Sequence, residues 1–126
     1  MTKNQISTAG APQAIGPYSQ AVVHQGTVYI SGQIPLIPET MLLVSDDITE
    51  QIDQVFSNLQ EICQAAGGDL DSIVKLTVYL INLDHFTAVN TAMENLLNKP
   101  YPARAAVEVS ALPKGAMVEV DAIMSL

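Results

Sequence analysis

The sequence is poor in charged side chains, and poorest in cations. Only 14% of its 126 residues are charged, and Lys and Arg number 5 against 13 Asp and Glu. Affinity for nucleic acid or for an anionic membrane rests on clustered Lys and Arg, so a net charge of −8 without a basic cluster argues against both partners. The 48% apolar content excludes a disordered chain. So few charges indicate that part of the surface is hidden, most simply by contact between subunits.

Cysteine and histidine are scarce as well. The single Cys63 can form neither an internal disulfide nor a thiolate zinc site, and His24 and His85 lie too far apart for a ligand pair. The N-terminal residues lack the apolar run of a secretion signal, and the longest apolar stretch, 73–81, is too short to span a bilayer. We therefore expect one cytoplasmic domain over residues 1–126, without a metal centre.

The first 17 residues are rich in turn formers, and the remaining pattern predicts five strands and two helices. Alternation and β-branched residues mark the strands at 18–24, 28–34, 73–81, 103–109 and 117–124. Apolar residues at spacings of three and four mark the helices. The first helix is expected to begin after Asp47, as N-cap, and to end at Gly67. The second is expected to begin after Asp84 and to end before Pro100.

The order strand, strand, helix, strand, helix, strand, strand predicts an α+β fold. Each strand–helix–strand unit favours a right-handed crossover, so both helices cover one face of a mixed sheet in a two-layer sandwich. The other face has no helix to cover it. Alternation along the last two strands assigns four charged residues to this uncovered face: Arg104, Glu108, Glu119 and Asp121.

Arg104, the only arginine in the chain, is a candidate anion-binding residue. It lies in an apolar stretch, and a planar guanidinium can hold a carboxylate through two parallel hydrogen bonds, which lysine cannot do. The structural alternative is an ion pair with Glu108 or Glu119, within one subunit or between two. Spacing alone leaves both interpretations open.

Glu119 is a candidate general acid and base. It lies on a strand of Val, Ala and Met, where loss of solvent would raise its pKa towards the useful range. Its alternative is a structural ion pair with Arg104 or Lys75. Asp121 shares its face and is interpreted as structural.

Three further residues have both a functional and a structural interpretation. Gly32, at a strand end, could leave its N–H free for a ligand, or it could mark a β-bulge. Tyr18 follows a rigid Gly-Pro turn and could contact a ligand or cover a sheet edge. Asn90 lies close to the apolar stripe of the second helix, where its amide needs a partner.

Five motifs at these residues, in the same order, resemble those of the Rid family (YjgF-type proteins), the enamine/imine deaminases. The resemblance runs nearly from end to end of the chain. The motifs are Gly16-Pro17-Tyr18-Ser19-Gln20, Ser31-Gly32-Gln33-Ile34-Pro35, Val89-Asn90, Tyr101-Pro102-Ala103-Arg104 with Val107-Glu108-Val109, and Leu112-Pro113-Lys114 with Val118-Glu119-Val120.

The resemblance implies a chorismate-mutase-like two-layer sandwich with a mixed six-stranded sheet and two helices on one face. It also implies a homotrimer in which the three sheets form a central barrel, with three sites in the clefts between subunits. Such a barrel would cover the helix-free face. A closed three-fold ring needs heterologous contacts, so each site would draw residues from two chains.

The implied reaction is hydrolysis of 2-aminoacrylate-type enamines and imines, reactive intermediates that leak from pyridoxal-phosphate enzymes, to 2-keto acids and ammonia. Arg104 would clamp the substrate carboxylate, and Glu119 would orient and deprotonate water and then protonate the leaving nitrogen. The Ala106 carbonyl would help to hold that water, at a position where many members have cysteine. No metal or cofactor is required. The remaining pocket residues would be Tyr18, Gly32 and Asn90.

Two alternatives to this deaminase stay open at this point. One is a non-catalytic trimer, chaperone-like or binding small carboxylates, that uses the same clefts. The other is a ribonuclease acting in translation inhibition, an activity that has been attached to relatives. The charge of −8 and the lack of a basic patch argue against the ribonuclease.

Overall fold

The computed structural model of the protein describes residues 2–126 and contains one sheet with two helices packed on it. The two helices are α1 (Ile48–Ala65) and α2 (Phe86–Leu96). Three short 3-10 helices, η1 (Leu70–Ser72), η2 (Leu83–His85) and η3 (Pro113–Gly115), lie in the connections. The strands are β1 (Asn4–Ile6), β2 (Ala21–His24), β3 (Thr27–Gln33), β4 (Ile73–Leu80), β5 (Ala103–Glu108) and β6 (Val118–Ser125). None of the helices within residues 2–126 has the length and apolar content that a bilayer span requires.

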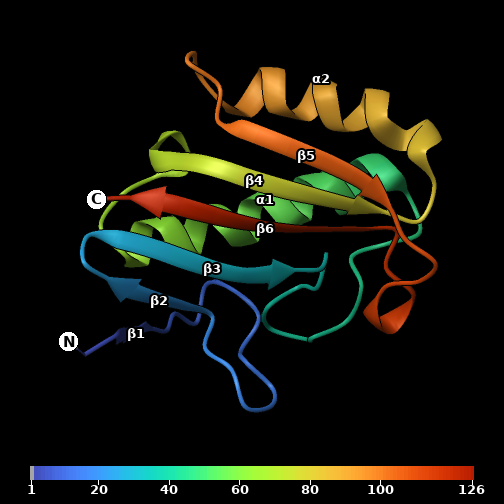
Figure 1. The fold of residues 1–126 in the computed structure, drawn as a ribbon. Coiled ribbons are helices and arrows are strands. Elements are labelled where there is room, and N and C mark those ends of the chain that lie inside the picture. Colours follow the sequence, from blue (N-terminus) through green and yellow to red (C-terminus); the bar gives the residue numbers. More distant parts are fainter. Residues whose placement is uncertain (1) are drawn as a thin grey trace.

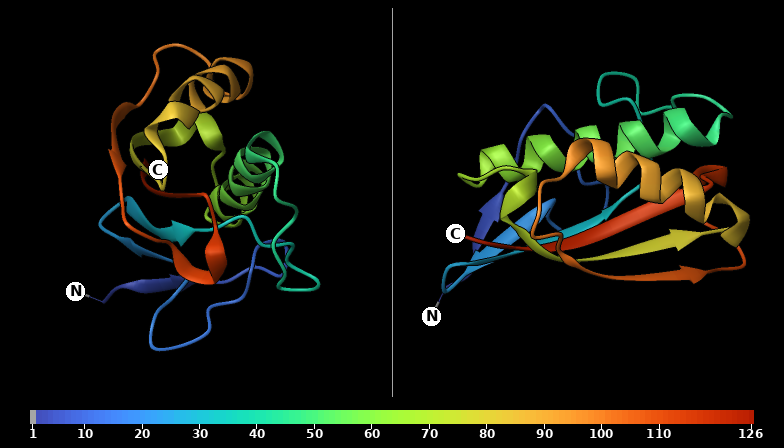
Figure 2. Two further views of the ribbon diagram at one scale, coloured as in Figure 1. Left: turned by 90° about the vertical axis from the view of Figure 1, so that its right-hand side faces the viewer. Right: turned by 90° about the horizontal axis from the view of Figure 1, so that it is seen from above.

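The sheet is mixed, with the strand order β1-β2-β3-β6-β4-β5 (Figure 1). Neighbouring strands run antiparallel except for β4 and β5, which are parallel and are joined by α2. Both helices lie on one face of the sheet and leave the other face open (Figure 2). The predicted α+β sandwich with six strands and two helices on one face is therefore confirmed.

The first helix begins and ends where the sequence predicts. The Asp47 carboxylate accepts a hydrogen bond from the backbone N–H of Glu50 at 2.9 Å, which satisfies one donor of the first turn. At the other end Gly67 adopts a φ of +102°, a conformation that costs glycine little and other residues much more. The apolar stripe between these ends is buried against the sheet: Ile52, Val55, Phe56, Leu59, Ile62 and Cys63.

Two predicted details were wrong. The turn-rich N-terminal stretch contains a strand, β1, which is too short and too exposed to show an alternating pattern. Asp84 does not cap the second helix. The Asn82 side chain instead accepts a hydrogen bond from the Asp84 N–H at 2.9 Å, which starts η2, and α2 follows with His85 in its N-cap position.

Three buried amide side chains hold the loops against the core. Gln20 forms four hydrogen bonds with the N-terminal loop, at Thr8, Ala11 and Pro12. Two amides of α1 bond in the same way to other loops. Gln51 forms hydrogen bonds with Ser45 and Met117, and Asn58 forms them with Ile34 and Leu36. Because a buried amide is costly without partners, these side chains determine where the loops lie.

The register of the sheet corrects the predicted assignment of charged residues to faces. Arg104 of β5 pairs with Leu76 of β4, which is buried under the helices, so Arg104 lies on the helix-covered face. Glu119 of β6 pairs with Tyr79 and lies on the open face. The alternation within each strand was predicted correctly, but the face to which β5 directs its charged residues was not. Arg104 stays exposed because β5 is the edge strand and α2 only partly covers it.

Candidate active site in two halves

Arg104 is held by uncharged groups of α2. Its Nη1 donates a hydrogen bond to Oδ1 of Asn90 at 2.6 Å and lies 3.5 Å from the sulfur of Met93. The guanidinium carbon is 4.6 Å from the centroid of the Phe86 ring, a cation–π distance. An amide, a thioether and a ring orient the guanidinium without neutralising its charge.

A pocket of about 360 Å³ opens beside this guanidinium. The exposed Tyr101 and the half-buried Pro102 form one wall, from the segment that leads into β5. Asn90, Met93 and Glu94 line the pocket from α2. A charged fork at the side of a small, partly apolar pocket suits a small molecule with one carboxylate.

The structural alternative for Arg104 does not hold within one chain. Glu108 accepts a hydrogen bond from the backbone N–H of Leu83 at 2.9 Å and so anchors the turn before α2. Glu119 lies on the opposite face of the sheet. Among residues 2–126 no carboxylate forms an ion pair with Arg104, and the predicted anion-binding role is left open to an incoming ligand.

Glu119 forms the core of the second half of the site, together with Gly32. The pairing of β3 with β6 shifts between Ile30 and Gln33, which places Gly32 in a β-bulge, as the structural interpretation expected. A Cβ atom added at Gly32 would overlap the Glu119 carboxylate. Only glycine therefore allows the carboxylate to lie against the backbone at this position.

The Glu119 carboxyl binds its proton more tightly than an exposed glutamate does. Burial raises its pKa above the usual value of 4.5, and the nearby charge of Asp121 raises the pKa further. The side chain is half-buried, so it still meets solvent. A carboxyl in this state is suited to both taking and returning a proton.

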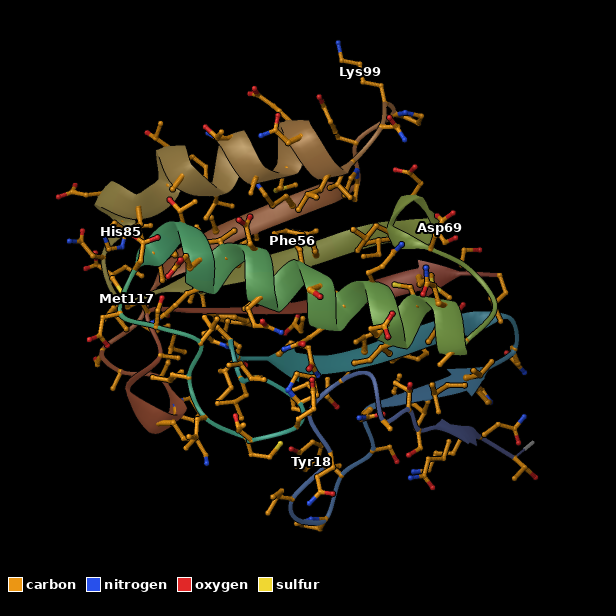
Figure 3. All side chains as sticks on the ribbon, turned by 180° about the vertical axis from the view of Figure 1, so that it is seen from behind. Tyr18, Phe56, Asp69, His85, Lys99 and Met117 are labelled. Atoms are coloured by element: carbon orange, nitrogen blue, oxygen red, sulfur yellow. The ribbon has the colours of Figure 1, made fainter. Side chains whose placement is uncertain are left out.

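The loop that carries Tyr18 is fastened next to Gly32. The Ser31 hydroxyl donates to the backbone oxygen of Ser19 at 2.6 Å, and the Ser31 N–H donates to the oxygen of Gln20 at 3.0 Å. Tyr18 itself is 51% exposed on this loop. Figure 3 shows Tyr18 at the side of the molecule opposite α2, the helix that lines the Arg104 pocket. Tyr18 and Gly32 therefore belong to the Glu119 half.

The six predicted site residues fall into two groups. Asn90, Arg104 and Ala106 lie together, since Ala106 follows on the same face of β5 and packs against the core. Tyr18, Gly32 and Glu119 lie on the other side of the sheet. One chain cannot bring the two groups together, because the sheet itself separates them.

Sequence reasoning missed three residues that contact the predicted ones. Phe86 and Met93 hold Arg104 from α2, and their spacing around Asn90, four residues before it and three after, places all three on one side of the helix. That spacing was a usable signal. Tyr79, the cross-strand partner of Glu119, had no comparable signal, because only the strand register makes these two residues neighbours.

Comparison with known proteins places this architecture in a family. The family description "Endoribonuclease L-PSP" matches residues 8–125. A goat protein named 2-iminobutanoate/2-iminopropanoate deaminase is 46% identical over 98% of this chain and 90% of its own length.

Solved structures show the same similarity. RidA from the Antarctic bacterium Psychrobacter sp. is 49% identical, with a TM-score of 0.94, over 98% of this chain and 99% of its own. Escherichia coli TdcF, solved with bound serine, is 34% identical, with a TM-score of 0.89, over 98% of each chain.

Proposed function

The chain belongs to the Endoribonuclease L-PSP (YjgF/Rid) family, and we propose that it is an enamine/imine deaminase. The substrates are 2-aminoacrylate-type enamines and 2-imino acids, and the products are 2-keto acids and ammonia. The deaminase name of the goat relative and the serine bound by TdcF, a small molecule with a carboxylate, support this proposal. The enzyme is a cytoplasmic hydrolase that removes reactive intermediates, and it acts as a homotrimer.

The single observation that carries the proposal is the state of Arg104. Its guanidinium is exposed at a pocket of about 360 Å³, and among residues 2–126 only Asn90, Met93 and Phe86 hold it. A cation that is oriented but not neutralised is prepared for an anion of matching geometry, and a carboxylate fits the guanidinium fork. Orientation by neutral groups lets the whole charge act on the substrate.

The separation of the two groups on opposite faces supports a site shared between subunits. The Arg104 group of one subunit would meet the Glu119 group of its neighbour, which a closed three-fold ring permits because its contacts are heterologous. The open face of the sheet carries exposed apolar side chains such as Tyr29 and Val107. Their burial in a trimer would account for the low charged fraction of the sequence.

Hydrolysis begins with substrate binding and the attack of water. Arg104 holds the substrate carboxylate, which fixes the imine carbon in place. Glu119 accepts a proton from a water molecule as the water oxygen bonds to that carbon, and the π electrons of the C=N bond move to nitrogen. An enamine first becomes the imine by taking a proton on its terminal carbon and losing one from its nitrogen.

The second stage releases ammonia. Glu119 returns the proton to nitrogen, which becomes an amino group. The hydroxyl on the carbon then passes its proton through Glu119 to the same nitrogen, and the C–N bond breaks as the carbonyl forms, so that ammonia leaves. The Ala106 carbonyl helps to hold the water, and the Gly32 N–H and Tyr18 line the pocket from the neighbouring subunit. Asn90 lines it from the Arg104 side. Because imines hydrolyse in water unaided, positioning and proton transfer account for the catalysis.

The ribonuclease in the family description has less support in this chain. Cleavage of RNA would require contact with phosphates, and the chain carries a net charge of −8. A trimer that only binds small carboxylates would use the same Arg104, but it would not need a half-buried carboxyl with a raised pKa at Glu119. That carboxyl favours catalysis over binding alone.

Replacement of Arg104 tests the proposal. An amino-acid oxidase generates the imine in the cuvette, and ammonia and keto acid are measured. Arg104→Ala should lower kcat/KM by at least about 100-fold while the trimer persists in size-exclusion chromatography, because an Arg–carboxylate contact contributes a few kcal/mol. Lys3→Ala is the matched control. It removes an exposed cation next to β1, at the edge of the sheet opposite β5.

Three outcomes contradict parts of the proposal. Unchanged turnover in Arg104→Ala would remove the assigned role of this residue. Binding of 2-ketobutyrate without any release of ammonia by the wild type would favour the binding trimer. RNA cleavage that the purified protein performs and Arg104→Ala does not would favour the ribonuclease.

A further inference from the structure

Two residues beside Glu119 have no part in the mechanism above. Tyr79 of β4 is the direct cross-strand partner of Glu119, and its hydroxyl donates a hydrogen bond to Oδ2 of Asp121 at 2.8 Å. Glu119 and Asp121 are two residues apart on β6, so both side chains emerge on the open face. Tyr79 thus lies next to both carboxylates and donates to the farther one along the strand.

The hydrogen bond from Tyr79 to Asp121 has an electrostatic consequence for Glu119. A phenolic hydroxyl has one proton to donate, so the bond to Asp121 leaves Glu119 without that donor. A hydrogen bond to an ionised carboxylate stabilises its charged form, and a neighbouring negative charge destabilises it. Glu119 lacks the hydrogen bond that Tyr79 could donate, and it faces the negative charge of Asp121. Both conditions oppose its ionisation.

We propose that Asp121 and Tyr79 are positioning residues that keep Glu119 ready to hold a proton: Asp121 opposes its ionisation and occupies the Tyr79 hydroxyl. The inference deepens the proposed function, on which the role of Glu119 as acid and base rests. Its physical content, the proton affinity of one carboxyl, can be measured without turnover.

The other groups on this face do not offset Asp121. Burial is the main cause of the raised pKa of Glu119, and the charge of Asp121 is the second. The same hydrogen bond to Asp121 raises the pKa of Tyr79. β5 presents only uncharged side chains on this face. The remaining titratable residues that the structure describes on it, or on the loop beside it, are Lys3, Tyr18, His24, Tyr29 and Lys75.

This group contains two lysines, of which Lys3 lies beside β1, three strands away from β6, and the nearer is Lys75. It pairs with Ile123, two positions beyond Asp121 and four beyond Glu119 on the same face, so it is closer to Asp121 than to Glu119. A cation at that distance from a half-buried carboxyl is screened by solvent. Within one subunit, the charge nearest to Glu119 along this face is therefore that of Asp121.

This arrangement suits a carboxyl that must move a proton twice. Glu119 takes the proton from water and returns it to nitrogen in each turnover, and a carboxyl that ionises too readily would return it slowly. Asp121 and Tyr79 contribute without touching the substrate. Their effect should therefore appear in the pH dependence of the reaction rather than in the binding of the carboxylate.

A series of three variants separates the two contributions. Asp121→Asn removes the charge but keeps an acceptor for Tyr79, and Asp121→Ala removes both and frees the phenol to donate to Glu119. The double variant Asp121→Ala/Tyr79→Phe then removes the freed donor. The titration midpoint of the Glu119 carboxyl is measured by 13C NMR on the trimer, with Glu119→Gln to assign its signal.

We expect the midpoint to fall in Asp121→Asn and to fall further in Asp121→Ala. In the double variant it should return to the value of Asp121→Asn. The acid limb of the kcat/KM profile should move to lower pH in the same order, with KM nearly unchanged. Asp53→Asn, an equal charge change on an exposed side chain of α1, should move neither the midpoint nor the limb.

An unchanged Glu119 midpoint in both Asp121 variants would overturn the inference, as would an equal fall in Asp53→Asn. Failure of the proposed function gives a different result. A wild type without deaminase activity, or an Arg104→Ala variant with full activity, would contradict that function while the NMR midpoints still decide on Asp121 and Tyr79. Asp121→Asn is close to isosteric, so its fold can be checked by the same spectra.

Discussion

The two halves of the proposed site are built in opposite ways on one sheet. Arg104 is exposed, stands on the edge strand β5 and is oriented by α2 through an amide and an aromatic ring. Glu119 is half-buried, stands on the inner strand β6 and lies against the backbone of Gly32. The cation keeps its full charge because no carboxylate among the described residues pairs with it. The carboxyl resists ionisation because it is buried near another acid.

This difference shows how a shared site can be prepared before assembly. A guanidinium needs only orientation, since it stays charged at any working pH. A carboxyl that must exchange protons needs an environment that shifts its pKa, which an inner strand supplies more readily than an edge. In the proposed trimer each half would be set within its own subunit, and the approach of two subunits would complete the site.

Mixed trimers should give the largest effect that separates the halves. Arg104→Ala and Glu119→Gln should each lower kcat/KM by about 100-fold or more, because one removes the carboxylate clamp and the other the proton carrier. When the two variants are unfolded and refolded together in equal amounts, about a quarter of the subunit interfaces receive both intact halves. Activity should therefore return to about a quarter of that of the wild type.

Refolding of Arg104→Ala with Arg104→Gln is the control, since both variants lack the same half. No recovery is expected there. If the first mixture also stayed inactive while forming trimers, the site would not be shared between subunits.

Loss of Gln20 should weaken the Glu119 half without touching the Arg104 half. Its amide forms four hydrogen bonds in the loop that carries Tyr18. Gln20→Ala leaves buried backbone groups without partners and should lower the free energy of unfolding by about 2–3 kcal/mol, measured by urea denaturation. Gln13→Ala, an exposed glutamine of the same loop, should change it little.

Hydrogen exchange locates the effect of Gln20→Ala. Faster exchange should be confined to the N-terminal loop and the end of β3, with α2 and β5 protected as in the wild type. Equal loss of protection in both halves would show that they are not independently built.

The smallest expected effect concerns the free energy of unfolding, which ionised Glu119 lowers. Its pKa is raised in the folded state, so folding favours the protonated form, and ionisation at neutral pH destabilises the protein. Glu119→Gln should therefore be more stable than the wild type at pH 7, by less than about 1 kcal/mol because solvent screens a half-buried charge.

The difference between Glu119→Gln and the wild type should shrink as the pH falls towards the usual glutamate pKa of 4.5, where the wild-type carboxyl is protonated as well. Thermal unfolding at several pH values measures this trend. Arg104→Gln serves for comparison, because an exposed guanidinium imposes no such cost. A Glu119→Gln variant less stable than the wild type at pH 7 would contradict the difference drawn between the halves.

Much of the fold could be predicted from the sequence because its elements are marked by local patterns. The stop at Gly67 and the cap at Asp47 follow from neighbours within a few residues, and both are confirmed. The family, too, was recognisable from short motifs. The six-stranded sandwich is confirmed, although β1 was missed because three exposed residues carry no periodicity.

What could not be predicted depends on strand pairing. Alternation tells which residues of β5 share a face but not which face that is, because Ala103, Ala105 and Ala106 are small enough for either side. The pairing of Arg104 with Leu76, which is buried under the helices, decides it. The hydrogen bond between Tyr79 and Asp121, 42 residues apart, depends on pairing in the same way.

The amino-acid sequence by itself determined the elements, their order and the residue types of the site, since local hydrogen bonding and hydrophobic periodicity act over a few residues. Only the tertiary structure decided that Arg104 and Glu119 lie on opposite faces, that Asn90 and Phe86 orient the one, and that Gly32 and Asp121 surround the other. The reason is that a strand's partners and its buried face are chosen by contacts far along the chain, where the free energy of burial outweighs any local preference.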